Sequence, residues 1–348
     1  MKAYTERVFG NHEGKDVLAY RFETDGGYQL EVMTYGATIL RYVTPDKAGN
    51  FANVILGFDD FDSYVGNSPK HGASVGPVAG RIAGATFELN GQTYNLEVNN
   101  ASNCNHSGST GWDASLFELT EVSDHGLTLY TERTDGTGGF PGNLKIWISY
   151  HLEETGAYEI SYKVTTDQDT LVNPTNHSYF NLSGEGSGDV MQHRVAIAAD
   201  HYLPTDAEQI PTGEIRPVAG TAFDFREPEA LGSRIRDGDS QLALAHGYDH
   251  TFVLREPGSL RHAASAVDPA SGRRLDVATT QPGLQLYTAN MLDGTVIGSG
   301  GRLYRSGDAV CFEAQGFPDA PNRAEFPSTT LRPGEVFTAT TTYRFRAD

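Results

Sequence analysis

Apolar and polar residues alternate along much of the chain, the pattern of strands that bury one face. The clearest run begins at Leu144, after which apolar residues recur at every second position up to Leu152. The alternation resumes from Tyr158 to Val164, after a short segment that contains a glycine. These runs predict neighbouring antiparallel strands with one buried face. A similar run from Phe337 to Phe345 predicts a strand at the C-terminus.

Shorter patterns predict further strands and one tight turn. Apolar residues alternate over Phe87–Leu96 around Asn90-Gly91, a pair that supplies the two positive φ angles of a type I′ hairpin turn. Short strands are expected around residues 30–32, 195–197, 284–287 and 310–312, and one short helix around 58–64.

The turn-forming residues between these segments indicate the fold class. Glycine occurs 39 times and proline 16 times, as many short turns require, and no long amphipathic helix competes with the strands. We therefore expect an all-β fold, a large antiparallel β-sandwich with few short helices. Residues 1–348 are expected to form a single domain, with a small C-terminal domain starting near Asn290 as the alternative.

Composition narrows the possible partners and location. The formal charge of −19 argues against nucleic acid and anionic membranes as partners. Residues 1–7 have no apolar stretch typical of a signal peptide, and no apolar run approaches the length of a membrane span. The two cysteines, Cys104 and Cys311, do not resemble a disulfide framework. A cytoplasmic protein, monomeric or homodimeric, is expected.

The segment 173–184 at the middle of the chain is dense in side chains that hold polar ligands. His177 is flanked by Asn176, Ser178, Tyr179 and Asn181, and apolar residues bracket the cluster, as in a ligand pocket. Histidine also titrates near neutrality, so it can move a proton. The alternative is a hydrogen-bonded structural histidine at a strand end.

Glu313 lies in a second segment of similar character, 312–322. Alternation places Phe312 on one face of a short strand, and Cys311 and Glu313 on the other. If Phe312 faces the core, Glu313 faces an open concave surface, and the loop that follows presents Asp319 and Asn322. Cys311 is then expected to border the pocket. The alternative, a solvated glutamate, is the commoner fate of this residue type.

Three weaker clusters are also polar and rich in turns. One is the asparagine-rich segment 99–108, which contains His106; another places Arg81 between two glycines, where backbone can approach a ligand. The third, 248–252, sets Asp249 beside an aromatic residue.

Taken together and in their order along the chain, the five segments resemble the aldose 1-epimerase (galactose mutarotase) family from about Tyr35 to the C-terminus. The resemblance rests on residues 80–84, 106–108, 176–182, 248–250 and 313–322, of which 176–182 is the sharpest motif. It implies the galactose mutarotase-like β-sandwich, with a sugar site on a concave sheet face. It also implies interconversion of the α and β anomers of free aldohexoses such as galactose or glucose.

The resemblance assigns His177 as general acid and Glu313 as general base, and Arg81, His106 and Asp249 as residues that hold the sugar. Opening the hemiacetal requires a base for the anomeric proton and an acid for the ring oxygen. We expect an ionised glutamate and a protonated histidine near neutrality. No cofactor or metal is expected, because the chemistry requires none and no motif has metal-ligand spacing.

Three positions depart from the family pattern. Gly80 stands where the family often has asparagine, Pro77 where it often has arginine, and Ser107 where it usually has glycine. These leave the sugar preference open. The alternatives are an epimerase of a disaccharide such as maltose or of a hexose 6-phosphate, a non-catalytic sugar-binding module, and a glycoside hydrolase that uses Glu313 and Asp249.

Overall fold

The computed structural model describes residues 4–66 and 69–347, and their fold is an antiparallel β-sandwich with few short helices, as predicted. The segment examined for a signal peptide lies partly outside these residues. One layer is a nine-stranded sheet. In spatial order it contains β11 (Glu118–Ser123), β12 (Gly126–Arg133), β13 (Leu144–Leu152), β14 (Ala157–Thr166), β29 (Phe337–Ala347), β23 (Arg273–Thr279), β22 (Arg261–Val267), β17 (Arg194–Ile197) and β20 (Glu229–Ala230).

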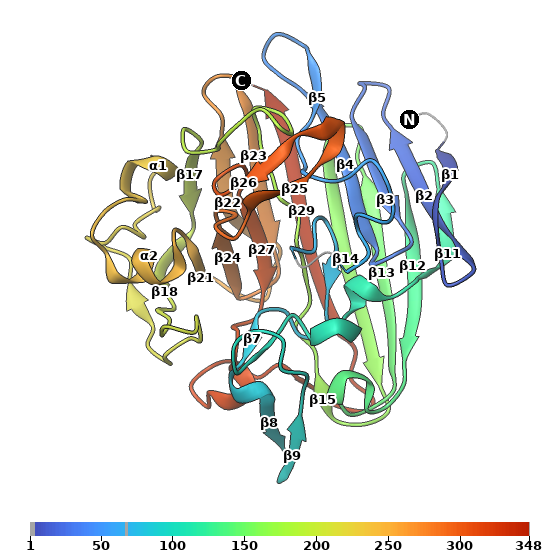
Figure 1. Ribbon diagram of the computed structural model, residues 1–348, viewed down its shortest axis with the longest axis vertical. Helices are drawn as coiled ribbons and strands as arrows, with labels where there is room; N and C mark the ends of the chain where they lie inside the picture. The colour runs from blue at the N-terminus through green and yellow to red at the C-terminus, as the bar shows by residue number, and fades with distance from the viewer. Residues whose placement is uncertain (1–3, 67–68, 348) are drawn as a thin grey trace.

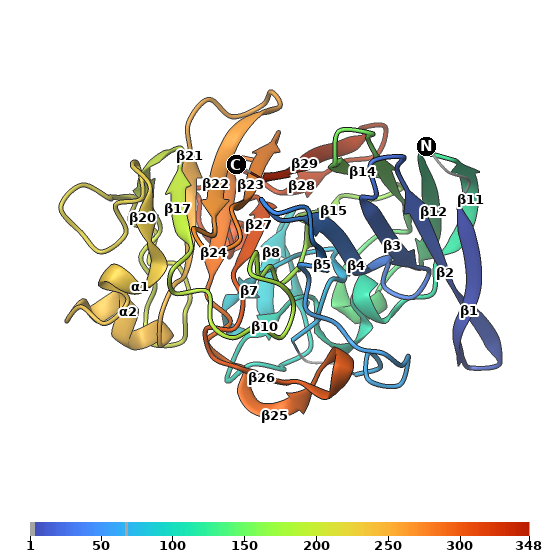
Figure 2. The same ribbon diagram turned by 90° about the horizontal axis from the view of Figure 1, so that it is seen from above.

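Two five-stranded sheets form the second layer, side by side across the broad sheet (Figure 2). The first contains β1 (Thr5–His12), β2 (Lys15–Glu23), β3 (Gln29–Met33), β4 (Thr38–Pro45) and β5 (Phe51–Asn53). The second contains β19 (Arg216–Pro217), β18 (Ala199–Tyr202), β21 (Asp249–Leu254), β24 (Gly283–Tyr287) and β27 (Cys311–Gln315).

Short strand pairs and helical turns fill the connections. The pairs are β6 (Ser74–Val75) with β16 (Thr175–Asn176), β7 (Arg81–Ile82) with β10 (Cys104–Asn105), β8 (Thr86–Leu89) with β9 (Gln92–Asn95), β15 (Thr170–Leu171) with β28 (Thr330–Leu331), and β25 (Asp293–Ile297) with β26 (Leu303–Arg305). The helices are α1 (Leu231–Arg234) and α2 (Ser240–Ala245), with single 3₁₀ turns at Ala83–Ala85, Gly108–Thr110, Trp112–Ala114, Thr137–Gly139, Ser299–Gly301 and Ala320–Asn322. Within the described part of the chain, no helix is long and apolar enough to cross a membrane.

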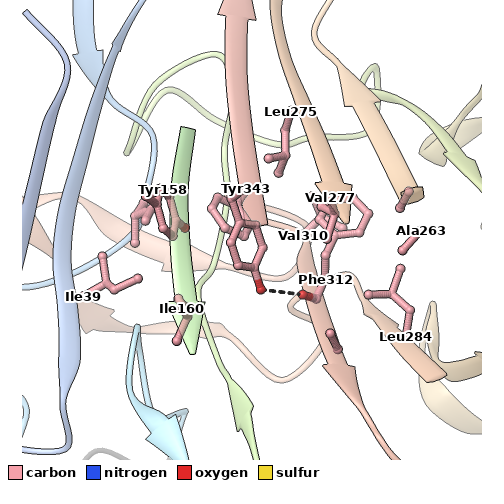
Figure 3. Close-up of a cluster of buried hydrophobic side chains, with 14 of the residues drawn as sticks. Ile39, Tyr158, Ile160, Ala263, Leu275, Val277, Leu284, Val310, Phe312 and Tyr343 are labelled. Atoms are coloured by element: carbon pink, nitrogen blue, oxygen red, sulfur yellow. Dashed lines mark hydrogen bonds between the residues drawn. The ribbon is translucent and has the colours of Figure 1, made fainter. Parts of the chain in front are cut away.

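The alternating runs form strands because their apolar faces meet in one core between the layers. Ile148 and Ile160 of the broad sheet share this core with Ile39 of the first small sheet and Phe312 of the second. The two layers also share a hydrogen bond, because the Tyr343 hydroxyl donates to the Phe312 carbonyl oxygen at 3.2 Å (Figure 3). The prediction that Phe312 faces the core is therefore confirmed, and Glu313 must point out of the other face of β27.

The hairpin prediction is also confirmed. Strands β8 and β9 pair with Leu89 opposite Gln92, and the residues between them, Asn90 and Gly91, have φ angles of 54° and 76°. Both angles are positive, as the type I′ turn requires.

The helix predicted around residues 58–64 is wrong, because this segment forms turns. The Asp60 carboxylate accepts hydrogen bonds from the Ser63 amide at 2.9 Å and hydroxyl at 3.0 Å. Such local side-chain bonds compete with helical hydrogen bonding. The aromatic residues Phe58, Phe61 and Tyr64 are buried in a second, smaller core cluster. The short helix α2, which the sequence analysis missed, has a recognisable signal because the Asp239 side chain caps its first turn.

Candidate active site

Three neighbouring strands of the second small sheet, β21, β24 and β27, line one side of a cavity of about 350 Å³. Their register places Asp249 opposite Tyr287 and Gln285 opposite Glu313. Alternate residues of a strand point to the same face, so one polar face is built from three strands. The residues that it presents to the cavity are Asp249, Thr251, Gln285, Tyr287, Glu313 and Gln315.

His177 reaches this cavity from the segment that follows β16. Its amide donates to the Ala73 carbonyl oxygen at 2.9 Å. The preceding residue, Asn176, donates from its side chain to the Gly72 carbonyl oxygen at 2.9 Å and accepts from the Ser178 hydroxyl at 2.6 Å. The polar residues of the central motif therefore satisfy buried backbone groups and fix the direction of His177.

His177 and Glu313 face each other across the cavity floor. Their closest polar atoms, Nε2 of His177 and Oε2 of Glu313, lie 3.7 Å apart, and the two residues are 5% and 3% exposed. The distance is short enough for both groups to reach adjacent atoms of one bound molecule. The structure thus brings together the two residues that the sequence analysis paired as acid and base.

Burial shifts the two pKa values in opposite directions. Loss of solvent, followed by the nearby charge of Asp249, raises the pKa of Glu313 well above its usual value, while Arg81 opposes this shift. Loss of solvent also lowers the pKa of His177 to about 3, partly opposed by a hydrogen bond to its own main chain. Burial therefore favours a carboxylic acid beside a neutral imidazole in the sugar-free site, instead of the charged pair that was expected.

Asp249 and Arg81 form the centre of a polar network on the cavity wall. The Asp249 carboxylate accepts a hydrogen bond from the Gln285 amide at 2.6 Å, and Gln285 in turn accepts from the Thr251 hydroxyl at 2.5 Å. Nη1 of Arg81 lies 3.9 Å from Oδ2 of Asp249. Burial raises the pKa of Asp249, although Arg81 and the Gln285 hydrogen bond oppose the shift. The carboxylate is thus held in a fixed orientation toward the cavity.

Arg81 is also oriented from the opposite side. Its Nε donates to the Asn100 side chain at 3.0 Å, and its guanidinium also donates to the Gln209 side chain. Among the described residues that line the cavity, Arg81 is the only lysine or arginine. The site therefore presents one positive charge surrounded by hydrogen-bond acceptors.

His106 follows β10 and lies beside His177, with ring centroids 5.4 Å apart. Its Nδ1 accepts a hydrogen bond from the Gly80 amide at 3.2 Å. Burial, with the charges of His177, Lys70 and Arg81, lowers the pKa of His106 well below its usual value. The ring is therefore neutral and carries its proton on Nε2, which leaves one hydrogen-bond donor for a ligand.

The five predicted site residues thus line a single cavity: Arg81, His106, His177, Asp249 and Glu313. The lining residues that the sequence analysis missed include Thr251, Gln209 and Gln285. Gln285 could have been found, because its position between the buried residues Leu284 and Leu286 places it on the opposite face of the strand. Gln209 lies in a loop, where no alternation of polar and apolar residues indicates its direction.

The loop after β27 differs from the expectation that it presents Asp319 and Asn322 to the pocket. Asp319 is 1% exposed and accepts hydrogen bonds from the Ala83 amide at 3.0 Å and the Asn322 side chain at 2.8 Å. Its own amide donates to the Arg81 carbonyl oxygen at 3.0 Å. Asp319 therefore ties this loop to β7 and supports Arg81 from behind.

Only one of the three departures from the family pattern touches the cavity within the described chain. Gly80 lines it with a φ of 73°, and a Cβ at this position would lie 3.0 Å from the Cβ of Pro318. Ser107 has a φ of 63°, and its hydroxyl bonds both the amide and the carbonyl of Val78 at 2.9 Å. The Pro77 carbonyl oxygen accepts from the Asn173 amide at 2.7 Å. Of the three departures, Gly80 is therefore the one placed to affect sugar preference by direct contact.

Cys311 lies on the same face of β27 as Glu313, but it does not border the cavity as predicted. It is fully buried, and its Sγ lies 3.7 Å from Nδ1 of His177. Ligand-type atoms of His177, Cys311 and Glu313 all lie within 4.8 Å of one another. The absence of a metal thus stays a prediction, since this trio has side chains of the types that bind zinc.

Comparison with known proteins points to one family. A family model described as aldose 1-epimerase matches residues 19–344. The chain is 42% identical to a galactose mutarotase from Mus musculus over 347 residues, which cover 99% of both chains. It is 35% identical to an aldose 1-epimerase from Escherichia coli over 97% of both chains.

Solved structures agree with these similarities. An aldose epimerase homologue from C. elegans superposes with a TM-score of 0.88 at 28% identity, covering 94% of this chain and 98% of that chain. A galactose 1-epimerase from Lactobacillus acidophilus gives a TM-score of 0.86 at 29% identity, covering 99% and 98%.

Proposed function

Because the chain belongs to the aldose 1-epimerase family, and is therefore an enzyme that interconverts the α and β anomers of aldoses, we propose that His177 and Glu313 are its acid and base. The observation that carries this assignment is the 3.7 Å approach of His177 Nε2 to Glu313 Oε2 in the polar cavity. The wall residues Arg81, His106 and Asp249 are proposed to hold the sugar through hydrogen bonds to its hydroxyls and ring oxygen.

In the ring-opening step, Glu313 takes the proton of the anomeric hydroxyl while His177 gives a proton to the ring oxygen. The bond between C1 and the ring oxygen breaks, its electron pair moves to the oxygen, and C1 becomes an aldehyde. Rotation about the C1–C2 bond exposes the other carbonyl face. Closure reverses both proton transfers and yields the other anomer.

The buried environment favours the opening step. Opening converts a carboxylate and an imidazolium into a carboxylic acid and a neutral imidazole, which is the arrangement that burial favours. Both arrangements contain the same number of protons, so they interconvert by transfer within the complex. We therefore expect a bell-shaped pH dependence of the rate, whose limbs belong to the pair.

The preferred substrate is proposed to be a free aldohexose such as galactose or glucose. The cavity of about 350 Å³ is at the small end of the range for ligand sites. A hexose 6-phosphate is disfavoured, because the described lining offers Arg81 alone as a cation beside the acidic residues Asp249, Asp293 and Glu313. The named relatives likewise do not favour a disaccharide epimerase, a silent sugar-binding module or a glycoside hydrolase.

We propose the whole chain, residues 1–348, as a single galactose mutarotase-like domain. The position of β29 between β14 and β23 supports this, because the last strand lies inside the broad sheet. A cytoplasmic location is supported by two buried cysteines that remain free, Cys104 and Cys311. The charge of −19 supports small sugars over nucleic acid or membranes as partners of a monomer or homodimer.

The test compares turnover with sugar binding in two variants. Glu313→Gln keeps the shape of the side chain but cannot accept the proton, and His177→Asn cannot protonate the ring oxygen. Each is expected to lower the polarimetric rate on pure α-galactose or α-glucose by about 10²–10⁴-fold. Calorimetric titration with the sugar should still detect binding. A Glu313→Gln protein that folds, binds sugar and interconverts anomers at the parent rate would overturn the assignment.

A further inference from the structure

The two ring nitrogens of His177 have different surroundings. Nε2 faces the cavity and lies 3.7 Å from Oε2 of Glu313. Nδ1 points away from the cavity and lies 3.7 Å from Sγ of Cys311, within hydrogen-bonding distance for sulfur. Tyr179 stacks on the imidazole with ring centroids 4.9 Å apart, and its hydroxyl donates to the Pro69 carbonyl oxygen at 3.0 Å. The stacking holds the ring plane, and the contacts with Cys311 and Glu313 distinguish the two nitrogens.

The proposed reaction places a requirement on the proton of the neutral imidazole. When Nε2 gives its proton to the ring oxygen, the proton that remains must be on Nδ1. Closure then needs an unprotonated Nε2 to take the proton back. A neutral ring with its proton on Nε2 cannot accept one there, because that nitrogen is then only a donor. Catalysis through Nε2 therefore needs the Nδ1–H tautomer.

We propose that Cys311 is a positioning residue that holds neutral His177 in the Nδ1–H tautomer by accepting a hydrogen bond from Nδ1 at its sulfur. The inference rests on the proposed acid and base roles. It gives a function to a cysteine that does not line the cavity. Cys311 would act on the reaction through its contact with His177, the proposed acid.

The chemical state of Cys311 fits this role. Burial, with the charges of Glu313 and Asp249, raises the pKa of the thiol well above its usual value, so the sulfur remains a thiol. A thiolate at this position would instead form an ion pair with the imidazolium and stabilise the charged ring. A neutral sulfur is only a weak acceptor. It can therefore select a tautomer without preventing His177 from losing its proton.

The opposite arrangement, in which the thiol donates to Nδ1, would put the imidazole proton on Nε2. Nitrogen-15 NMR of histidine-labelled protein distinguishes the two arrangements, because protonated and unprotonated ring nitrogens have different shifts and couplings. The His177 signals are identified by their loss in His177→Asn. We expect a protonated Nδ1 and an unprotonated Nε2 in the sugar-free enzyme at neutral pH. The reverse pattern would overturn the proposal without any variant of Cys311.

Variants of Cys311 then connect the tautomer to turnover. Cys311→Ala removes the acceptor and is expected to lower kcat by roughly 10- to 100-fold, by analogy with the loss of a partner that orients a metal-ligating histidine. The KM should change little, and the NMR signals should show a mixture of tautomers. Cys311→Ser retains an acceptor and should recover most of kcat and the Nδ1–H signal. Cys104→Ala is the matched control, because it removes the other buried thiol.

The outcomes separate this inference from the proposed function. If His177→Asn abolishes turnover while Cys311→Ala retains the parent kcat and tautomer, the acid assignment stands and the role of Cys311 is refuted. If His177→Asn retains the parent rate, the acid assignment itself is refuted. A loss in Cys311→Ala that Cys311→Ser does not restore, with an unchanged tautomer, indicates a packing role and also refutes the proposal.

Discussion

Replacing Asp249 by asparagine tests the polar network of the cavity wall and its effect on the catalytic pair. The substitution keeps the size of the side chain and an oxygen that accepts from Gln285, but it removes the charge that lies 3.9 Å from Nη1 of Arg81. At an effective dielectric constant of about 20, two charges at that distance attract by about 4 kcal/mol. Burial outweighs this attraction, since the pKa of Asp249 is raised despite the arginine.

The expected loss is therefore that of a hydrogen bond between a charged group and a sugar hydroxyl, roughly 1.5–3 kcal/mol. This corresponds to a fall in kcat/KM of about 10- to 150-fold. The pH profile should also move. Asp249 raises the pKa of Glu313, so removing its charge makes proton loss from the pair easier and shifts the basic limb of kcat/KM to lower pH.

Polarimetry on pure anomers of galactose and glucose, repeated across pH, measures both effects. Asp200→Asn is the matched control, because this exposed aspartate pairs with Arg255 on the surface. Deoxy sugars identify the hydroxyl concerned, since the analogue that lacks it should lose little further activity in the variant. An Asp249→Asn enzyme with the parent kcat/KM on both sugars, or with its basic limb at higher pH, would refute the assignment of Asp249.

Two further predictions concern metals and stability. Dialysis against a chelator should leave the rate unchanged. Added zinc should inhibit competitively with sugar by binding His177, Cys311 and Glu313. Activity that is lost on chelation and restored by a divalent ion would contradict metal independence. Burial lowers the pKa of His250 to about 3. The unfolded chain therefore binds a proton below about pH 6.5 that the folded protein excludes, and stability should fall by about 1.4 kcal/mol per pH unit between these values. Urea unfolding of His250→Gln should show a pH slope smaller by this amount, and an unchanged slope would count against a neutral buried histidine.

The amino-acid sequence by itself determined the strands and the polar segments. Strict alternation fixed which face of each strand is buried, as in 144–152 and 337–345, because the period of a strand is two whatever its neighbours are. It also placed Phe312 and Glu313 on opposite faces of β27. The hairpin at Asn90-Gly91 was predictable because its turn needs positive φ angles that few residue pairs supply. The site residues were found through family motifs, since local pattern left each of them with a structural alternative.

Only the tertiary structure decided which strands far apart in the sequence are neighbours. Backbone hydrogen bonds are alike for every partner strand, so alternation does not show that β27 pairs with β24 and thereby places Gln285 beside Glu313. For the same reason the sequence could not predict the contact of Cys311 with Nδ1 of His177, because 134 positions separate the two residues. Burial raises the pKa of Glu313 and lowers that of His177, and it too arises only when the layers pack together. The sequence supplied the reactive groups, and their packing against one another decided which proton each one holds.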